Sequence, residues 1–280
     1  MKDGIYPGLS WDDYRAIDAL NGSSIIPMRK SPMYYRFMRE NPQPPTDAMI
    51  LGTATHRLVL EPEKAGDFAV WGEREEEKVR RGQIWEAFKT AHGGKMIVTV
   101  AERNAMVGMA VGARRNAPIM RYAGAKGETE VTMLWTDKVT GRRWKGRIDK
   151  LIEKGHIIFD LKTCRACNKY KFGAQAHQLG YHIKMGLYWS GYKTLTGEAA
   201  KCVLGAIENK EPFESAVYRC TSDVILQGLE DLDGLLRTLT QCELTGEWPA
   251  AEPEELELTL PSYAYTQPED DLSDLELVEE

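Results

Sequence analysis

The sequence predicts an α/β fold, in which a mixed central sheet is flanked by helices and preceded by an N-terminal helical elaboration. Three strand-like runs follow one another between residues 130 and 161, and a helical segment spans 172–192. Two further strands and a closing helix then complete the patterned part of the chain. A meander that continues through a crossover helix into more strands gives a mixed sheet with helices on its faces.

The first 45 residues carry the signals of short helices. Ser10 can cap a helix that has an acid at its third position. A second helix start lies at 21–24, with the sequence Asn-Gly-Ser-Ser, and a third lies at Ser31, which is followed by a proline. The proline-rich stretch 41–45 is expected to end this third helix.

Three longer helices are expected before the strands. Residues 48–60 form an apolar run that is typical of a buried helix and is stopped by Pro62. Residues 73–89 are charged and helical in pattern. Residues 101–116 carry small residues at spacings that allow close helix packing.

The strands are assigned from their apolar patterns. Residues 130–135 alternate in polarity, and 143–152 return as a second strand after a turn. A turn at 153–155 leads into 156–161, which is apolar enough for a central strand. The remaining elements are strands at 201–207 and 215–220 and a helix at 221–242, capped by Thr221 or Ser222.

The composition is that of a folded protein. Hydrophobic residues make up 42% of the 280 residues, which is enough for a core and excludes wholesale disorder. No apolar run reaches the roughly 18 residues that span a bilayer, and the first residues lack the apolar stretch of a secretory signal. Five cysteines, an odd number, suit reduced thiols. We therefore expect a cytoplasmic protein.

The charge is divided between a mildly basic body and an acidic tail. The net charge is −6, but residues 251–280 hold eleven acids and no Lys or Arg, so the rest carries 36 basic and 31 acidic groups. A mildly basic body is compatible with phosphate binding. We expect an N-terminal helical region at 1–115, a core that holds the sheet at 116–248, and a disordered or loosely docked tail at 249–280.

Two acids and a lysine mark a candidate catalytic centre. Asp149 lies on one predicted strand, and Asp160 and Lys162 lie on the next. Antiparallel pairing across a tight turn can bring the two carboxylates together, and a hard divalent cation between them relieves their repulsion. Lys162 shares a strand face with Asp160 and can orient or deprotonate a water, or neutralise charge on a phosphate. This arrangement suits metal-assisted phosphodiester hydrolysis.

So short a motif recurs by chance, and the plainer explanation is a pair of surface acids with Lys162 bonded to one of them. The flanking sequence favours the catalytic interpretation. Runs at 145–151, 158–163 and 181–188, with Gly-Thr-Ala-Thr-His at 52–56 and a serine motif at 21–32, resemble in order the RecE-type exonucleases. That family belongs to the PD-(D/E)XK nuclease superfamily and is related to the RecB nuclease domain. The resemblance covers about residues 6–192 and implies a PD-(D/E)XK nuclease core.

The resemblance implies a metal centre to which the N-terminal region contributes. His56, Asp149 and Asp160 would hold the ion, with the Leu161 carbonyl as a further ligand. Histidine is an unusual ligand for Mg²⁺ and a more natural one for Mn²⁺, so either ion fits. Lys162 would be the catalytic lysine. Taken alone, His56 is more simply explained as a satisfied helix histidine.

A further acid is implied at the start of the first strand. Glu130 matches the family's acidic residue there and would join catalysis as an outer ligand through water. Glu128 competes for this role. A surface salt bridge is the alternative for either side chain.

The resemblance also implies DNA contacts. Lys184 stands where the family usually carries the Gln of Gln-x-x-x-Tyr, and it shares a helix face with Tyr188, so it could contact a phosphate. Packing is the alternative for Tyr188. Arg147 belongs to a basic stretch that is either a backbone-binding edge or a solvated hairpin face. Ser23 and Ser24 could hold a terminal phosphate through backbone N–H groups or simply cap a helix.

The implied activity is 5′→3′ digestion of linear double-stranded DNA, which leaves 3′ single strands for phage-type recombination. The implied partners are DNA ends, a single-strand annealing protein and further copies in a homo-oligomeric ring. An endonuclease or single-strand nuclease of DNA repair, or an inactive DNA-binding scaffold, remains an alternative. Cys164 and Cys167 lack the companions that an iron–sulfur cluster needs, so no cluster is expected.

Overall fold

A mixed sheet forms the centre of the protein in the computed structural model, which describes residues 1–74, 77, 79–252 and 254–261. Within these residues the sheet has six strands in the order β1-β4-β5-β6-β7-β8. Only β6 and β7 among the described strands of this sheet run parallel. The strands are β1 (Gly4–Tyr6), β4 (Glu128–Thr136), β5 (Arg143–Ile152), β6 (Ile157–Cys164), β7 (Lys201–Glu208) and β8 (Ser215–Arg219).

The connections explain this strand order. β4, β5 and β6 form a meander, because tight turns join each strand to the next; Gly141 has φ +67° in the first turn and Gly155 has φ +96° in the second. The chain then crosses over through α8 (Lys169–Gln178) and α9 (Tyr181–Thr196), which lets β7 pair parallel to β6. The predicted mixed sheet with flanking helices is therefore confirmed.

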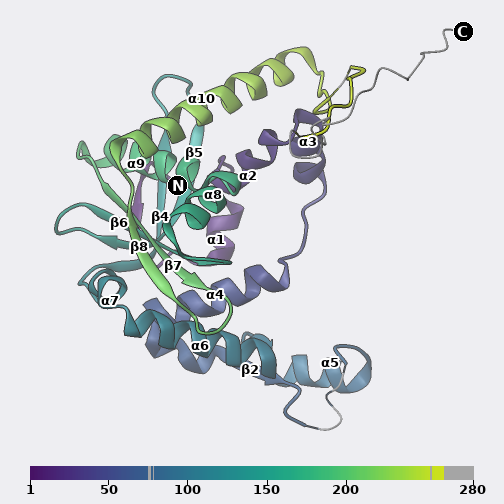
Figure 1. The fold of residues 1–280 in the computed structure, drawn as a ribbon, viewed down its shortest axis with the longest axis vertical. Helices are drawn as coiled ribbons and strands as arrows, with labels where there is room; N and C mark the ends of the chain where they lie inside the picture. Colours follow the sequence, from purple (N-terminus) through teal and green to yellow (C-terminus); the bar gives the residue numbers. More distant parts are fainter. Residues whose placement is uncertain (75–76, 78, 253, 262–280) are drawn as a thin grey trace, which may run out of the picture.

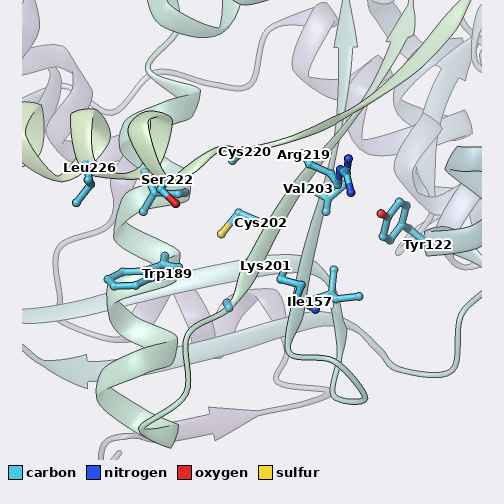
Figure 2. A pocket seen from close by; sticks show the side chains of 12 residues that line it. Tyr122, Ile157, Trp189, Lys201, Cys202, Val203, Arg219, Cys220, Ser222 and Leu226 are labelled. Carbon is cyan, nitrogen blue, oxygen red and sulfur yellow. The ribbon is translucent and has the colours of Figure 1, made fainter.

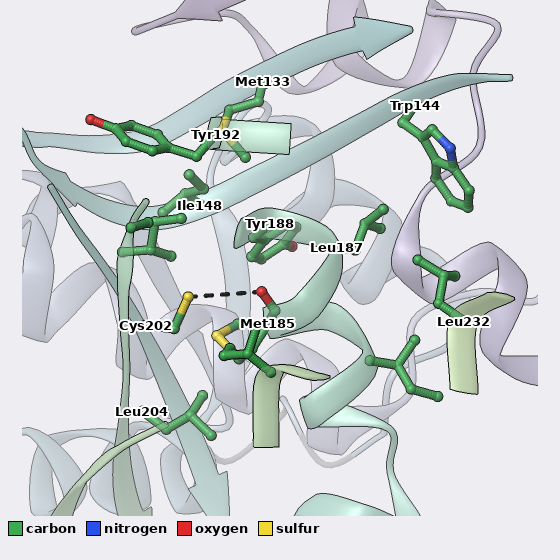
Figure 3. Packing of buried hydrophobic residues seen from close by; sticks show 14 of the residues in the cluster. Met133, Trp144, Ile148, Met185, Leu187, Tyr188, Tyr192, Cys202, Leu204 and Leu232 are labelled. Carbon is green, nitrogen blue, oxygen red and sulfur yellow. Dashed lines mark hydrogen bonds between the residues drawn. The ribbon is translucent and has the colours of Figure 1, made fainter. Parts of the chain in front are cut away.

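Helices cover both faces of the sheet (Figure 1). On one face, α9 and α10 (Ser222–Thr245) enclose the larger apolar cluster, which includes Trp135, Trp144 and Ile183. Figure 3 shows how Ile148, Tyr188 and Leu204 meet in this cluster between the sheet and α9. On the other face, α4 (Asp47–Leu60), α6 (Val100–Arg115) and α7 (Ala117–Ala123) enclose a second cluster with Ala54, Met109, Phe159 and Leu161.

Two glycines let α9 lie directly on the sheet. A Cβ at Gly191 of α9 would be 2.8 Å from the ring of Trp135, and a Cβ at Gly146 of β5 would be 2.7 Å from the ring of Tyr188. Real side chains do not tolerate such distances, so both positions require glycine for the helix to approach this closely. The position of α9 matters because this helix carries several candidate site residues.

The short N-terminal helices start where their caps predict. Ser10 accepts a hydrogen bond from the Asp13 backbone N at the start of α1 (Trp11–Ala16). Asn21 and Ser24 form a capping box at α2 (Gly22–Ile25), which continues into the 3₁₀ helix η1 (Ile26–Arg29). Ser31 caps α3 (Pro32–Glu40), with Pro32 in the first turn.

Two predicted helices have different limits from those expected. The expected helix at 172–192 is two helices, because Gly180 adopts φ +69° and ends α8 before α9 begins. The expected helix at 73–89 begins only at α5 (Gly82–Ala91). Gly72 before the helix and Gly82 as its first residue both have positive φ. Residues 75, 76 and 78 of that prediction lie outside the described residues.

Several short elements were not predicted. β1 is only three residues long, yet it pairs with β4 and so brings the predicted N-terminal helical region into the sheet. β2 (Phe68–Trp71) follows the 3₁₀ helix η2 (Pro62–Asp67) and pairs parallel with β3 (Met96–Thr99) in a separate two-stranded sheet. Residues 249–252 and 254–261 are neither helix nor strand, and 262–280 of the predicted tail lie outside the described residues. Among the described helices, none combines the length and apolar character of a membrane span.

Candidate active site

The strands β5 and β6 separate where the two predicted acids lie. Their backbone pairing runs from Ile152–Ile157 to Lys150–Phe159 and then stops. One step further, the same register puts Asp149 across from Asp160. There the Asp149 carboxylate accepts a hydrogen bond from the Leu161 backbone N, at 2.8 Å. A side-chain carboxylate thus replaces a backbone partner and holds the two strand ends together.

Lys162 lies beside Asp160, as the strand periodicity predicts. Its ammonium forms an ion pair with the Asp160 carboxylate and donates to the Leu161 carbonyl at 3.2 Å. The ring of Tyr181 lies 5.4 Å from the same ammonium. Asp160 is almost fully buried, and burial lowers the pKa of Lys162 to about 7, against the charge of Asp149. The lysine can therefore gain or lose its proton near neutral pH.

His56 reaches the same place from the opposite layer. It lies on α4, and its Nδ1 is 3.3 Å from Oδ2 of Asp149. Burial lowers the pKa of His56, although the charge of Asp149 opposes this shift. Burial alone would raise the pKa of Asp149, but His56, Lys162 and the Leu161 hydrogen bond together hold it below its ordinary value. The pair therefore consists of a neutral imidazole and an ionised carboxylate near neutral pH.

A third acid lies next to Asp149 on β4. Pairs on either side, Thr129–Lys150 and Val131–Ile148, put Glu130 across from Asp149. Glu130 has φ +51°, a left-handed backbone conformation that interrupts the regular pairing here without adding a residue to the strand. Burial raises its pKa, and the charge of Asp149 adds to this shift. Glu128, the competing acid, is exposed at the start of the strand, whereas Glu130 faces the charge of Asp149 directly.

Arg147 borders this row of acids. Its Nε donates to Glu130 Oε2 at 2.7 Å, and its guanidinium lies 5.4 Å from the exposed ring of Trp11 and 5.8 Å from that of Tyr14. The Nη1 atom is buried and has no hydrogen-bond partner. A guanidinium with one free donor next to a metal-type site is suited to an anionic oxygen.

The rest of the predicted basic edge is used elsewhere. Lys145 is buried and donates to the Tyr14 and Ile17 carbonyls at 2.9 and 2.7 Å, at the end of α1. Arg142 forms an ion pair with Glu243 of α10. The dense run of basic residues is thus not one continuous surface. Arg147 is the basic residue of this run that contacts Glu130.

Of the two predicted DNA contacts on α9, Tyr188 is buried and Lys184 is not. The ammonium of Lys184 lies 6.0 Å from the ring of Tyr188, and its positive charge lowers the pKa of both Asp149 and Lys162. Tyr188 is buried, and its hydroxyl donates to the Arg147 carbonyl at 3.0 Å. Its ring therefore has no surface to offer DNA, and the packing alternative is the correct one for Tyr188.

The two serines also differ. The hydroxyl of Ser24 is engaged in the capping box: it accepts from the Asn21 backbone N at 3.0 Å and donates to the Asn21 carbonyl at 2.8 Å. Ser23 is exposed at the same helix start. The side chain of Ser24 thus has the ordinary capping role, and Ser23 is the exposed one of the two serines.

The donors of the site suit a divalent cation. Two carboxylates, a neutral imidazole and the Leu161 carbonyl are oxygen and nitrogen ligands of the kind that Mg²⁺ or Mn²⁺ accepts. In the described part of the chain, however, the donor atoms of His56, Asp149 and Asp160 do not form a group within 4.8 Å of one another. Asp160 is paired with Lys162 instead. It would have to turn from the ammonium for all three residues to share an ion.

Sequence reasoning missed three side chains that shape this site. Tyr181 lies over Lys162, and Trp11 lies over Arg147. Glu61, at the end of α4, is buried, accepts from Thr129 Oγ1 at 3.0 Å and adds to the raised pKa of Glu130. Tyr181 lay within a recognised motif and could have been found; for Trp11 and Glu61 no local signal pointed to the site.

One surface pocket lies apart from these residues. Figure 2 shows this pocket of about 540 Å³ near the start of β6, β7 and α10, where Trp189, Cys202 and Arg219 line it. None of the candidate catalytic residues contributes to its lining.

Comparison with known proteins identifies the family. Residues 23–258 match the model of a family described as "PDDEXK-like domain of unknown function (DUF3799)". The chain belongs to this family. The match includes His56, Asp149, Asp160 and Lys162, and the predicted membership of the PD-(D/E)XK superfamily is confirmed.

Two solved structures are similar to this PDDEXK-like protein, and the first of them shares its fold. A protein of Eubacterium rectale named as a candidate exonuclease is 15% identical, with a TM-score of 0.58, over 82% of this chain and 86% of its own. An alkaline exonuclease of Laribacter hongkongensis is 11% identical over 60% of this chain and 86% of its own, with a TM-score of 0.30. No curated protein matches the sequence.

Proposed function

We propose that this PDDEXK-like protein is a divalent-metal-dependent deoxyribonuclease. One observation carries the proposal. The Asp149 carboxylate lies 2.8 Å from the Leu161 backbone N and 3.3 Å from His56 Nδ1. The ion pair between Asp160 and Lys162 lies beside these contacts. Acids, a neutral imidazole and a lysine of low pKa thus meet where two strands separate. Such a group suits phosphodiester hydrolysis, because it combines cation ligands with a proton-transferring amine.

The metal ligands in this proposal are Asp149, Asp160, His56 and the carbonyl of Leu161. They would hold Mg²⁺ or Mn²⁺. The bound ion would supply Lewis-acid chemistry, which lowers the pKa of a water and stabilises negative charge on the phosphate. Asp149 is already ionised and oriented by the Leu161 backbone, so it would bind without rearrangement.

Lys162 is the proposed catalytic lysine. With a pKa of about 7 it can take a proton from the attacking water or donate one to the developing charge on phosphate. Its ion pair with Asp160 keeps the amine at the site before substrate arrives. The ring of Tyr181, 5.4 Å from the ammonium, adds a cation–π contact.

The neighbouring side chains would bind and orient DNA. Arg147 has a free Nη1 donor for a phosphate oxygen, and Glu130 fixes the rest of its guanidinium. Glu130 would itself contact the ion through water. Lys184 adds positive charge beside the acids. Ser23 would lie near the DNA end through its exposed position at the start of α2.

The substrate in this proposal is the end of linear double-stranded DNA. Digestion would run 5′→3′ and leave a 3′ single strand for an annealing protein in phage-type recombination, with several copies of the chain forming a ring. The support is the ordered set of RecE-type motifs, in particular 52–56, 145–151 and 158–163, which lie around the acids described above. A protein of the same fold is named as a candidate exonuclease, which supports the exonuclease part of the proposal.

Activity can be tested with linear duplex DNA labelled at either the 5′ or the 3′ end. We expect loss of the 5′ label first, in Mg²⁺ or Mn²⁺ and not in EDTA. Asp160→Asn should abolish digestion while DNA binding persists, because the amide removes the charge and little else. Asp233→Asn is the matched control, since Asp233 is an exposed acid on α10 whose ion-pair partner is Arg237.

Closed circular DNA separates the exonuclease from its alternatives. We expect covalently closed circles to stay intact until they are linearised. Cleavage of circles would replace the exonuclease with an endonuclease, and preference for single strands would remove the double-strand assignment. Unaltered DNA under all metal conditions, with binding retained, would leave only a scaffold role.

A further inference from the structure

Three side chains with metal-binding groups meet where α8, α9 and α10 come together. His177 lies in the last turn of α8, His182 in the first turn of α9, and Asp231 on α10. One donor atom from each of the three lies within 4.8 Å of the others. None of them belongs to the candidate active site. We propose that this cluster binds a transition-metal ion of the Zn²⁺ class, with the two imidazoles as ligands and Asp231 as the carboxylate that orients His182.

The helix corner brings the two imidazoles together. Gly180 adopts φ +69°, which ends α8 and turns the chain into α9 within three residues. Arg29 holds this corner by donating to the carbonyls of His177 and Gln178, at 2.7 and 3.0 Å. As a result, the rings of His177 and His182 lie face to face, with centroids 5.2 Å apart and an interplanar angle of 17°.

A glycine brings the carboxylate to the same place. A Cβ at Gly228 of α10 would lie 2.1 Å from the His182 carbonyl, so only glycine permits this approach of α10 to α9. Asp231 follows one helical turn later, and its Oδ2 is 2.8 Å from Nε2 of His182. Its other oxygen accepts from Gln227 Nε2 at 2.8 Å, so the carboxylate is fixed at both atoms.

The second nitrogen of His182 is the independent observation. Nδ1 is buried and has no hydrogen-bond partner, and the side chain is 8% exposed. When Nε2 carries the only ring proton and donates it to Asp231, Nδ1 has a bare lone pair. A buried acceptor without a partner costs free energy. A metal ion at Nδ1 would satisfy this lone pair.

The chemistry of this group favours Zn²⁺ over Mg²⁺. Imidazole nitrogens suit Zn²⁺ and its neighbours in the first transition row, whereas Mg²⁺ prefers oxygen. A histidine that binds a metal usually donates its other ring N–H to a carboxylate, which is the relation of His182 to Asp231. His177 is exposed, so its ring can turn to present a nitrogen. Water would complete the coordination, and the ion would join the α8–α9 corner to α10.

The test is a Zn²⁺ titration of the full, untagged chain by calorimetry, with Asp149 and Asp160 both changed to Asn so that the candidate active site binds no ion. We expect one Zn²⁺ per chain. His177→Ala should weaken binding at least tenfold, and Asp231→Asn should weaken it about 10- to 100-fold. The controls His92→Ala and Asp233→Asn should bind as the parent does, since neither residue belongs to the cluster.

A spectroscopic measurement distinguishes the loss of a metal ligand from misfolding of a variant. Co²⁺ bound to the parent chain should give visible absorption bands that His177→Ala loses, and His177 is exposed, so this change should not disturb folding. His182→Gln should lose the same bands. The inference fails if the parent takes up no Zn²⁺, or if His177→Ala and Asp231→Asn bind it as tightly as the parent. Nuclease assays in Mg²⁺ report on the other site separately, so failure of one proposal leaves the other unaffected.

Discussion

The Asp149 carboxylate accepts a hydrogen bond from the Leu161 backbone N at 2.8 Å, in the position where the next backbone rung between β5 and β6 would lie. One carboxylate oxygen therefore holds two strands together and also faces His56. Structural and catalytic roles of this side chain can be separated, because the hydrogen bond needs only an acceptor whereas a cation ligand needs the charge.

Asp149→Asn should retain the fold and lose activity. The amide oxygen can still accept from Leu161, so the melting temperature should change little. Loss of an inner metal ligand should lower the rate by about 100-fold or more, since even outer partners contribute about 10- to 100-fold. Asp149→Ala should also destabilise the protein by about 1–3 kcal/mol, because it leaves the Leu161 N–H without a partner. Equal melting of the two variants would contradict the structural role.

Lys162→Met should lower activity and make stability dependent on metal. The change removes the partner of the buried Asp160 carboxylate. We expect a rate loss of about 10²- to 10⁴-fold and a destabilisation of up to about 3 kcal/mol in EDTA. Mg²⁺ or Mn²⁺ should restore much of that stability in thermal unfolding, because the cation replaces the ammonium. Absence of any metal effect on this variant would count against Asp160 as a ligand.

Arg147→Gln should weaken DNA binding in a salt-dependent way. Its unpaired Nη1 is the donor assigned to a phosphate. In a background that carries Asp160→Asn, the slope of log affinity against log salt should decrease by about 1. Arg237→Gln is the control, because Arg237 is an exposed residue on α10. An unchanged slope for Arg147→Gln would remove this phosphate contact.

Replacing either of two helical glycines by alanine should change the stability of the protein, in opposite directions for the two positions. Gly191→Ala would place a methyl group 2.8 Å from the Trp135 ring, and overpacking of this kind should cost about 1–3 kcal/mol. At Gly234 of α10 nothing lies within 4 Å of the added Cβ, so Gly234→Ala should stabilise the protein by about 0.5–1 kcal/mol through helix propensity. Urea unfolding of both variants measures the contrast; destabilisation at Gly234 or neutrality at Gly191 would disprove it.

The sequence predicted those features of the fold and the site that depend on residues close together along the chain. Capping by Ser10, Asn21 and Ser31 and the meander from 130 to 161 depend on neighbours along the chain, so they were predicted well. The pairing of Asp160 with Lys162 follows from the two-residue period of a strand. Family membership rests on the same local motifs, read in order.

The sequence did not predict those features that depend on packing between segments far apart along the chain. The apolar pattern of 172–192 predicted one long helix, whereas the positive φ of Gly180 separates α8 from α9. Tyr188 and Lys145 looked like surface contacts in amphipathic or basic stretches, yet both are buried by elements far away in sequence. β1 is too short to show a period, and it exists because β4 offers it an edge.

The turn between β5 and β6 has a consequence for how this protein can vary. Three backbone rungs, from Ile152–Ile157 to Lys150–Phe159, separate that turn from the two acids. Inserting or deleting a single residue within either strand would shift the count and send one carboxylate to the opposite side of the sheet. Changes of length should therefore accumulate among relatives at the loop tips and be excluded from these two short strand segments.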